Sequence, residues 1–126
     1  MNPVYSTEAL RAISQSQNVT ANNIANINTN EFKASRLDLE TGPEGRGVRP
    51  AQIVEDATPG PPVPVQQVFE NDQGRMEQRE AVVEGSNTDL VREISQMILD
   101  ERAFEANART VRTHDRLAGN IIDILV

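Results

Sequence analysis

The first 28 residues carry a hydrophobic pattern with the three- and four-residue steps of a helix. Asn2 and Pro3 suit the cap and the first position of this helix, because a proline there loses no needed N–H. One stripe contains Leu10, Ile13, Gln17, Thr20, Ile24 and Ile27, of which four are apolar. The pattern predicts a helix to about Asn28 with an interrupted contact face. Gln17 and Thr20 fit a wet interface and a register-setting role equally well.

The segment from Asn87 to Val126 repeats this pattern more regularly. Ser86 to Asp89 supply cap candidates with the spacing of a capping box. The heptad positions are Leu90, Ile94, Met97, Glu101, Phe104, Ala108, Val111, Asp115, Ala118, Ile122 and Leu125, and nine of the eleven are apolar. Val91, Ile98, Leu117, Ile121 and Ile124 widen the stripe. The segment therefore reads as one long helix with a broad apolar face.

Between Thr41 and Gly85 the composition shifts to helix breakers, with six of the seven prolines and six of the seven glycines. Two short runs in this segment flank Asn71 to Gly74, where Gly74 can take the left-handed conformation that closes a hairpin loop. We therefore predict a mainly α fold, in which long N- and C-terminal helices pack as an elongated coiled coil and the middle contains at most a small β-hairpin. The corresponding segments are 1–33, 34–85 and 86–126.

The second helix is too long for a compact molecule. It would extend about 57 Å at ~1.5 Å per residue, whereas a compact sphere of this chain length is about 35 Å across. The composition, 37% hydrophobic but only 3% aromatic, is also lean for a self-sufficient core. An apolar stripe that projects beyond its own core normally marks an interaction surface. Oligomerisation is the physical expectation.

Charge and composition exclude several classes of partner. The 12 basic residues are scattered among 19 acidic ones, which argues against a nucleic-acid surface. The apolar runs are far shorter than the roughly 20 residues that span a bilayer, so we expect no membrane insertion. The first residues lack the features of a secretory signal peptide, so any export is expected to use another route. The chain contains no cysteine, which excludes disulfides and thiolate metal sites.

No motif indicates catalysis. His114 is the only histidine, and one neighbouring carboxylate is too little for a metal site or a catalytic dyad. The acidic residues near Glu101 alternate with arginines at helical spacing, as surface ion pairs do. The glycine-rich segment 42–47 lacks the spacing of a phosphate-binding loop. We therefore expect neither an enzyme nor a cofactor or metal site.

The segment ANNIANINTNEFK (residues 21–33) places five asparagines at the end of a predicted helix, where asparagine is a poor helix former. One of Asn26, Asn28 and Asn30 is expected to end the helix in the left-handed conformation. Side-chain amides at Asn22 and Asn23 can fix the register of packed helices without a buried charge. The segment closely resembles the signature A-N-N-[LI]-A-N-[VI]-x-T-x-x-[FY]-[KR] of flagellar basal-body rod and hook proteins.

The C-terminal part carries matching signatures. SNTDLVRE (residues 86–93) and RAFEAN (residues 102–107) resemble that family's S-N-V-D-x-V-x-E and R-A-Y-E-A-N. The small size, and the similarity of IVED (residues 53–56), favour the short proximal-rod C-type protein (FlgC-like) within the family. Glu31 stands where the family often has glycine.

The resemblance implies a structural subunit of the bacterial flagellar basal-body proximal rod that self-assembles through its terminal helices and transmits torque. The subunit-packing residues would be Leu10, Ile13, Ile24, Ile27, Leu90, Ile94, Met97, Phe104, Val111, Ile122 and Leu125. The family-motif residues would be Asn22, Asn23, Asn26, Thr29, Phe32, Lys33, Asn87, Asp89, Glu105 and Asn107.

The implied partners are copies of the chain, other rod subunits and the flagellar type III export apparatus. The implied location is the basal body, in a periplasmic rod or its cell-wall-spanning equivalent, reached without a cleaved signal peptide. The alternative is a coiled-coil adaptor or export chaperone of a type III secretion system, which would use the same heptads in a closed dimer.

Overall fold

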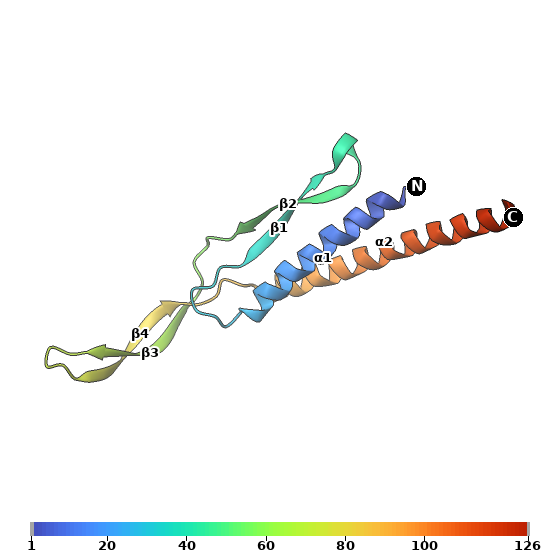
Figure 1. Cartoon of the computed structure of the whole chain (residues 1–126). Helices are drawn as coiled ribbons and strands as arrows, with labels where there is room; N and C mark the ends of the chain where they lie inside the picture. The colour runs from blue at the N-terminus through green and yellow to red at the C-terminus, as the bar shows by residue number, and fades with distance from the viewer. Residues whose placement is uncertain (1, 126) are drawn as a thin grey trace.

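The computed structural model describes residues 2–125 as an elongated molecule of two helices and two β-hairpins (Figure 1). Along the chain the elements are α1 (Pro3–Ala25), β1 (Ser35–Thr41), a 3-10 turn (Pro43–Gly45), β2 (Val48–Glu55), β3 (Pro62–Glu70), β4 (Met76–Glu84) and α2 (Leu90–Leu125). The helices lie side by side and run in opposite directions, with β1 and β2 along α1. The hairpin of β3 and β4 projects from the end of the molecule opposite the start of α1 and the end of α2 (Figure 1).

Helix α1 begins as its sequence predicts. The Asn2 side chain accepts a hydrogen bond from the backbone N–H of Val4 at 3.0 Å, and Pro3 occupies the first helical position. The buried positions of α1 carry mostly small or polar side chains, with Ile13 as the one large apolar residue: Ser6, Ala12, Ile13, Thr20 and Asn23. Thr20 is only 3% exposed in the single chain.

Helix α2 begins at the end of the predicted cap segment. The Asp89 side chain accepts hydrogen bonds from the N–H groups of Val91 at 3.0 Å and Arg92 at 3.3 Å, which makes Asp89 the cap. The 36 residues of α2 extend about 54 Å. Pro3, at the start of α1, lines a small cavity together with Leu117 of α2. The contact between the two helices therefore reaches along α2 to about Leu117. The last turns of α2 extend past α1 (Figure 1).

Strands β1 and β2 form an antiparallel hairpin whose register shifts between Asp38 and Leu39. Asp38 lies opposite Gln52 and Leu39 opposite Pro50, which leaves Ala51 as the extra residue of a bulge. A proline cannot donate to the ladder, and a bulge is one of the places where a strand accommodates it. The bulge therefore explains how β2 contains Pro50.

The β1–β2 hairpin packs on α1 and not on a second sheet. Its turn reaches the start of α1, where Gly47 has a φ of 71°. A Cβ atom at Gly47 would lie 2.9 Å from the Tyr5 ring, so glycine is needed for both its backbone and its close approach. The hairpin thus covers one flank of α1 along much of the helix.

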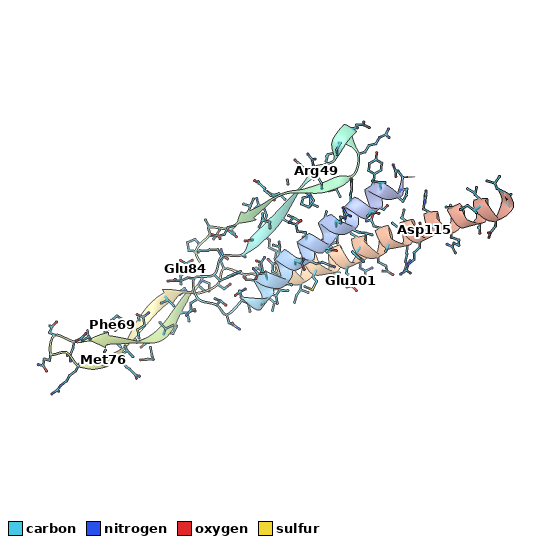
Figure 2. All side chains as sticks on the ribbon, in the orientation of Figure 1. Arg49, Phe69, Met76, Glu84, Glu101 and Asp115 are labelled. Carbon is cyan, nitrogen blue, oxygen red and sulfur yellow. The ribbon has the colours of Figure 1, made fainter. Side chains whose placement is uncertain are left out.

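Strands β3 and β4 pair antiparallel without a register shift, from Pro62 opposite Glu84 to Glu70 opposite Met76. The Asn71 N–H donates to the carbonyl of Arg75 at 2.8 Å across the loop, and Gly74 has a φ of 73°. The predicted hairpin and the left-handed Gly74 are both confirmed. Phe69 and Met76 lie at its far end, away from the helices (Figure 2).

The predicted fold class is wrong in its account of the middle segment and of the helix pair. Two β-hairpins occupy this segment, and the helices pack over part of their lengths beside a sheet and not as an extended coiled coil. The alternation of Leu37 and Leu39 with Asp38 and Glu40 is a strand pattern that lies outside the Pro/Gly-rich stretch. The glycines and prolines that follow mark turns and a bulge between strands, and not a connector without regular structure.

The hydrophobic core is very small. Among residues 2–125 the buried hydrophobic residues are Ala12, Ile13 and Ala34, whereas eighteen large hydrophobic side chains are exposed and eleven of these belong to α2. In the same part of the chain, no helix combines the length and the apolarity needed to cross a bilayer. The described residues also gather no cluster of three or more acidic, histidine or cysteine side chains with the geometry of a metal site.

Candidate functional site

All three connections between the helices and hairpins meet at one place, which we call the junction: residues 31–35, 56–61 and 84–87. Backbone hydrogen bonds link these segments directly: Glu31 N–H to Glu84 O at 2.8 Å, Asp56 N–H to Ala34 O at 2.8 Å, Gly85 N–H to Pro61 O at 2.7 Å and Asn87 N–H to Phe32 O at 3.3 Å. A loop cannot bury polar backbone without partners, so these bonds allow irregular chain to form a compact joint. The joint sets the direction of both hairpins relative to the helices.

Asn87 is the central side chain of the junction. Its Oδ1 accepts the backbone N–H of Ala34 at 2.7 Å. Its Nδ2 donates to the carbonyls of Asp56 at 2.7 Å and Thr58 at 2.8 Å. An amide offers both donors and acceptors, so one asparagine ties the start of α2 to the segments on either side of the β1–β2 hairpin.

Lys33 and Glu84 form an ion pair that closes the same joint. Lys33 Nζ also donates to the Thr58 carbonyl at 3.0 Å, and Glu84 Oε1 accepts the Gly60 N–H at 2.7 Å. The hydrogen bond from Lys33, followed by that from the Gly60 N–H, lowers the pKa of Glu84 from its ordinary value. Glu84 marks the base of the β3–β4 hairpin in Figure 2, so the pair anchors that arm.

Asn23 joins α1 to β1. It is 1% exposed, and its Nδ2 donates to the Ser35 carbonyl at 2.7 Å while its Oδ1 accepts the Ser35 N–H at 2.9 Å. The side chain thus satisfies both backbone groups of one residue, as a neighbouring strand would. Sequence reasoning expected this amide to contact another helix, but within the chain its partner is the first residue of β1.

The end of α1 is organised by Asn22, Asn26 and Thr29. Asn26 Nδ2 donates to the Asn22 carbonyl at 2.9 Å, and the Thr29 hydroxyl donates to Asn26 Oδ1 at 3.1 Å. Asn26 is the C-cap with a φ of −104°, and none of the three predicted asparagines takes the left-handed conformation. Glu31 does so, with a φ of 62°, at the position where the resembled family often has glycine. The prediction of a left-handed asparagine is wrong because side-chain bonding along the helix ends it instead.

The remaining motif residues act locally. Asp89 caps α2, Glu105 forms an ion pair with Arg109 one turn on, and Asn107 Nδ2 donates to the Ala103 carbonyl at 2.8 Å. Phe32 is half-buried beside the junction. Within the chain, Glu105 and Asn107 therefore contact only their own helix.

The residues predicted to pack between subunits fall into two groups. Ile13 is buried at 8% exposure, and a second set is half-buried: Leu10, Ile24, Ile27, Met97 and Val111. The others lie exposed on α2: Leu90, Ile94, Phe104, Ile122 and Leu125. One chain therefore covers the α1 positions and leaves much of the α2 stripe open.

The most exposed part of this stripe is the end of α2 that passes α1, which we call the distal face: Leu117, Ile121, Ile122, Ile124 and Leu125. Ile124 and Leu125 are 82% and 80% exposed. Leu99, at 62%, is also exposed and was missed by the heptad pattern. Burial of apolar surface gains about 25 cal/mol per Å², so these side chains favour association.

Comparisons with protein families match both ends of the chain. Residues 5–33 match the model described as flagella basal body rod protein, and residues 79–124 match the model described as flagellar basal body rod FlgEFG protein C-terminal. The first match contains most of α1 with Asn23, and Lys33 after it; the second contains the last part of β4 with Glu84, then Asn87, and nearly all of α2. A search of curated proteins found no match.

Proposed function

Because the chain belongs to the flagellar basal body rod family, we propose that it builds the rod by repeated association with its own copies and with other rod subunits. The family is structural and non-enzymatic, and its place is the flagellar basal body. We further propose that the self-association uses the terminal helices and that the assembled rod transmits torque. In it, residues 1–33 and 86–126 form the packing segments and 34–85 face outward or bridge subunits.

One observation carries the proposal, namely the surface that a single chain leaves uncovered. The accessible surface is 9257 Å², whereas a compact chain of this mass exposes about 6,700 Å². The excess of about 2,600 Å² is of the size that obligate interfaces bury. Eleven of the eighteen exposed large hydrophobic side chains lie on α2, so association through this helix is the obvious way to bury them.

The proposed subunit contacts are the exposed heptad positions of α2, led by Leu90, Ile94, Phe104, Ile122 and Leu125. An interface that repeats without closing produces a helical tube. Stiff helices in such a tube carry a twisting load from one subunit to the next. The junction would keep each hairpin at a constant angle to its helices while the load passes.

We assign the chain to the proximal rod, as a subunit most like the short C-type protein. The support is the segment between the two helices, residues 26–89, which holds only two short hairpins. We further propose export through the flagellar type III apparatus. The very small core supports this step, because a chain with little to unfold passes a narrow channel readily.

Sedimentation velocity across a concentration series tests the proposal, combined with hydrogen exchange at residues 87–125. Growth into open-ended polymers, alone or with added rod subunits, together with new protection along the distal face of α2, is the expected result. A closed dimer of constant size at all concentrations would contradict it and favour the adaptor or export chaperone. A monomer at all concentrations, with or without rod subunits, would contradict both.

A further inference from the structure

A cavity of about 310 Å³ opens where α1, the β1–β2 hairpin and α2 meet, next to the junction. Five apolar side chains of α1 and the hairpin line it, namely Ile13, Val19, Leu37, Leu39 and Val54, together with polar ones that include Thr20 and Arg36. On the α2 side two acidic residues, Glu93 and Asp100, line it. The cavity therefore combines apolar surface with acidic side chains.

Both acidic residues are buried, and the carboxylate of Asp100 is incompletely paired. Asp100 is 7% exposed; its Oδ1 accepts a hydrogen bond from Gln96 Nε2 at 2.9 Å, and its Oδ2 has no hydrogen-bond partner among residues 2–125. Glu93 is 8% exposed, and its carboxylate makes no ion pair or hydrogen bond in the described part of the chain. An unpaired buried carboxylate costs free energy that a counter-charge recovers.

The basic side chains that line the cavity do not supply this counter-charge. Arg36 forms its ion pair with Asp38 at 3.0 Å. Arg92 lies toward Asp56, whose pKa is lowered first by hydrogen bonds from Thr58 and then by the charge of Arg92. Among residues 2–125, no basic side chain forms an ion pair with Glu93 or Asp100.

The shape and chemistry of the cavity fit an arginine side chain. An arginine lays its apolar stem along hydrophobic walls and presents a flat, multiply donating head to carboxylates. The cavity is several times the ~30 Å³ that one water occupies in the liquid, so a single ordered water would not fill it. The terminal torsion of an aspartate is soft, so a small rotation brings Oδ2 of Asp100 to an incoming donor.

The chain carries suitable arginines on its own surface. Lys33 is the only lysine and is engaged at the junction, so all other basic side chains are arginines. Arg102, Arg112 and Arg116 are exposed on α2 and make no ion pair or hydrogen bond within residues 2–125. They lie on the same helix as the surface proposed to bind other copies.

From these observations we infer that the cavity receives an arginine of α2 from a second copy of the chain, whose guanidinium pairs with the Asp100 carboxylate. The inference rests on the proposed self-assembly and adds a specific polar contact to it. The apolar stripe supplies most of the buried surface, and the arginine selects one register, because a misplaced neighbour leaves Asp100 unpaired.

The first test compares the association of the full chain with that of Asp100→Asn, which keeps the size of the side chain and removes its charge. Sedimentation should show association weakened at least about tenfold, because a buried charge-assisted contact is lost. Asp72→Asn, in the exposed β3–β4 loop, makes the same charge change far from the cavity and should alter association less than about twofold. Circular dichroism of each variant checks that the helices are retained.

A second test identifies the partner directly. The chain has no cysteine, so in Asp100→Cys mixed with Arg102→Cys, Arg112→Cys or Arg116→Cys a bifunctional thiol reagent can link only different copies. Its spacer should match the length of an arginine side chain, because a direct disulfide needs a much shorter distance between the two Cα atoms. One of these three mixtures should cross-link well above Asp100→Cys mixed with Arg75→Cys, at the hairpin loop. The absence of such a preference would overturn the assignment to an arginine of α2.

The outcomes separate this inference from the proposed function. If the wild-type chain polymerises and Asp100→Asn polymerises equally well, the cavity holds solvent only and the inference is overturned, while the proposed function stands. If the wild-type chain does not associate with itself or with rod subunits, both are overturned. Weakened association of Asp100→Asn together with a preferred α2 cross-link would support both.

Discussion

The junction and the distal face of α2 differ in how far one chain satisfies its own groups. In the junction, Asn87 and Lys33 pair with backbone atoms of other segments, and Asn23 of α1 pairs with Ser35, so that part is complete in the single chain. On the distal face, Ile121 and Ile124 are 58% and 82% exposed. Directional hydrogen bonds are satisfied within the subunit, and non-directional apolar surface is left for neighbours. The comparison indicates that changes in the junction affect folding and changes on the distal face affect assembly.

The largest effect on folding is expected from Asn87→Ala. The change removes three side-chain hydrogen bonds and leaves the partners Ala34, Asp56 and Thr58 without them. The free energy of unfolding should fall by about 3–4 kcal/mol, measured by urea denaturation of the purified chain. Asn107→Ala, which removes one exposed bond within α2, is the matched control and should change it by less than about 0.5 kcal/mol. Equal effects of the two variants would remove the distinction between junction and helix surface.

Asn23→Ala should have the next largest effect on folding. It removes both bonds to the Ser35 backbone from a side chain that is 1% exposed. The expected loss is about 2–3 kcal/mol, and the amide of Ser35 should exchange its hydrogen faster than in the wild type. Asn18→Ala, at an exposed position of the same helix, is the control. A slow Ser35 amide in Asn23→Ala would show that α1 holds β1 by other contacts.

Ile121→Ser should show the opposite behaviour, with assembly weakened and folding unchanged. The side chain is 58% exposed in the single chain, so its removal costs little there. In an interface it would forfeit about 1.5–2 kcal/mol, or roughly a 10- to 30-fold weaker association constant. Sedimentation gives the association constant and urea denaturation gives the stability, with Asn120→Ser as the neighbouring control. A loss of stability without a loss of association would contradict the comparison.

Glu31→Gly should stabilise the chain by about 1 kcal/mol. Glu31 has a φ of 62°, a conformation that costs an L-residue about 1–2 kcal/mol and costs glycine almost nothing. Part of that gain is lost because glycine has more freedom in the unfolded chain. Thermal unfolding measures the difference in stability. Glu44→Gly, at φ 61° in the turn of the β1–β2 hairpin, tests whether replacing a left-handed glutamate by glycine stabilises the chain only at the junction.

The smallest effect is expected from the ionisation of Glu84. Its pKa is lower in the folded chain than the ordinary 4.5, so its contribution to stability is complete above that value and is lost as the pH falls through the folded pKa. Glu84→Gln should therefore flatten the fall in stability below pH 4.5 that the wild type shows. Unfolding curves at a series of acidic pH values measure it. An unchanged acid profile would show that Lys33 and Glu84 contribute little to the joint.

Much of the helical part was predictable because it depends on local signals. The Asn2 cap, the Pro3 start and the Asp89 cap each need only neighbours along the chain, and the structure places α1 and α2 accordingly. Gly74 was predictable for the same reason, since a hairpin loop is a short-range structure. The β1–β2 hairpin was missed because its partner strands and its bulge at Pro50 are recognised only when Leu37 and Ile53 are known to pair.

The motif asparagines were found by their resemblance to a family, but their partners were not predictable. Asn23 bonds to a residue 12 positions away, and Asn87 to one 53 positions away. The cavity with Asp100 was not expected either, because its walls come from α1, both strands of one hairpin and α2. A run of acidic and basic residues along a helix looks the same in sequence whether a carboxylate is buried or solvated.

By itself the sequence determined the two helices, their N-terminal caps, the β3–β4 loop and the surplus of apolar surface, because period, caps and composition are properties of neighbouring residues. Only the tertiary structure decided which backbone groups the asparagines satisfy, how far α1 covers α2, and which carboxylates lose their water. These depend on distances between segments that are far apart along the chain. They are set by the balance of many weak contacts across the fold, which no local pattern records.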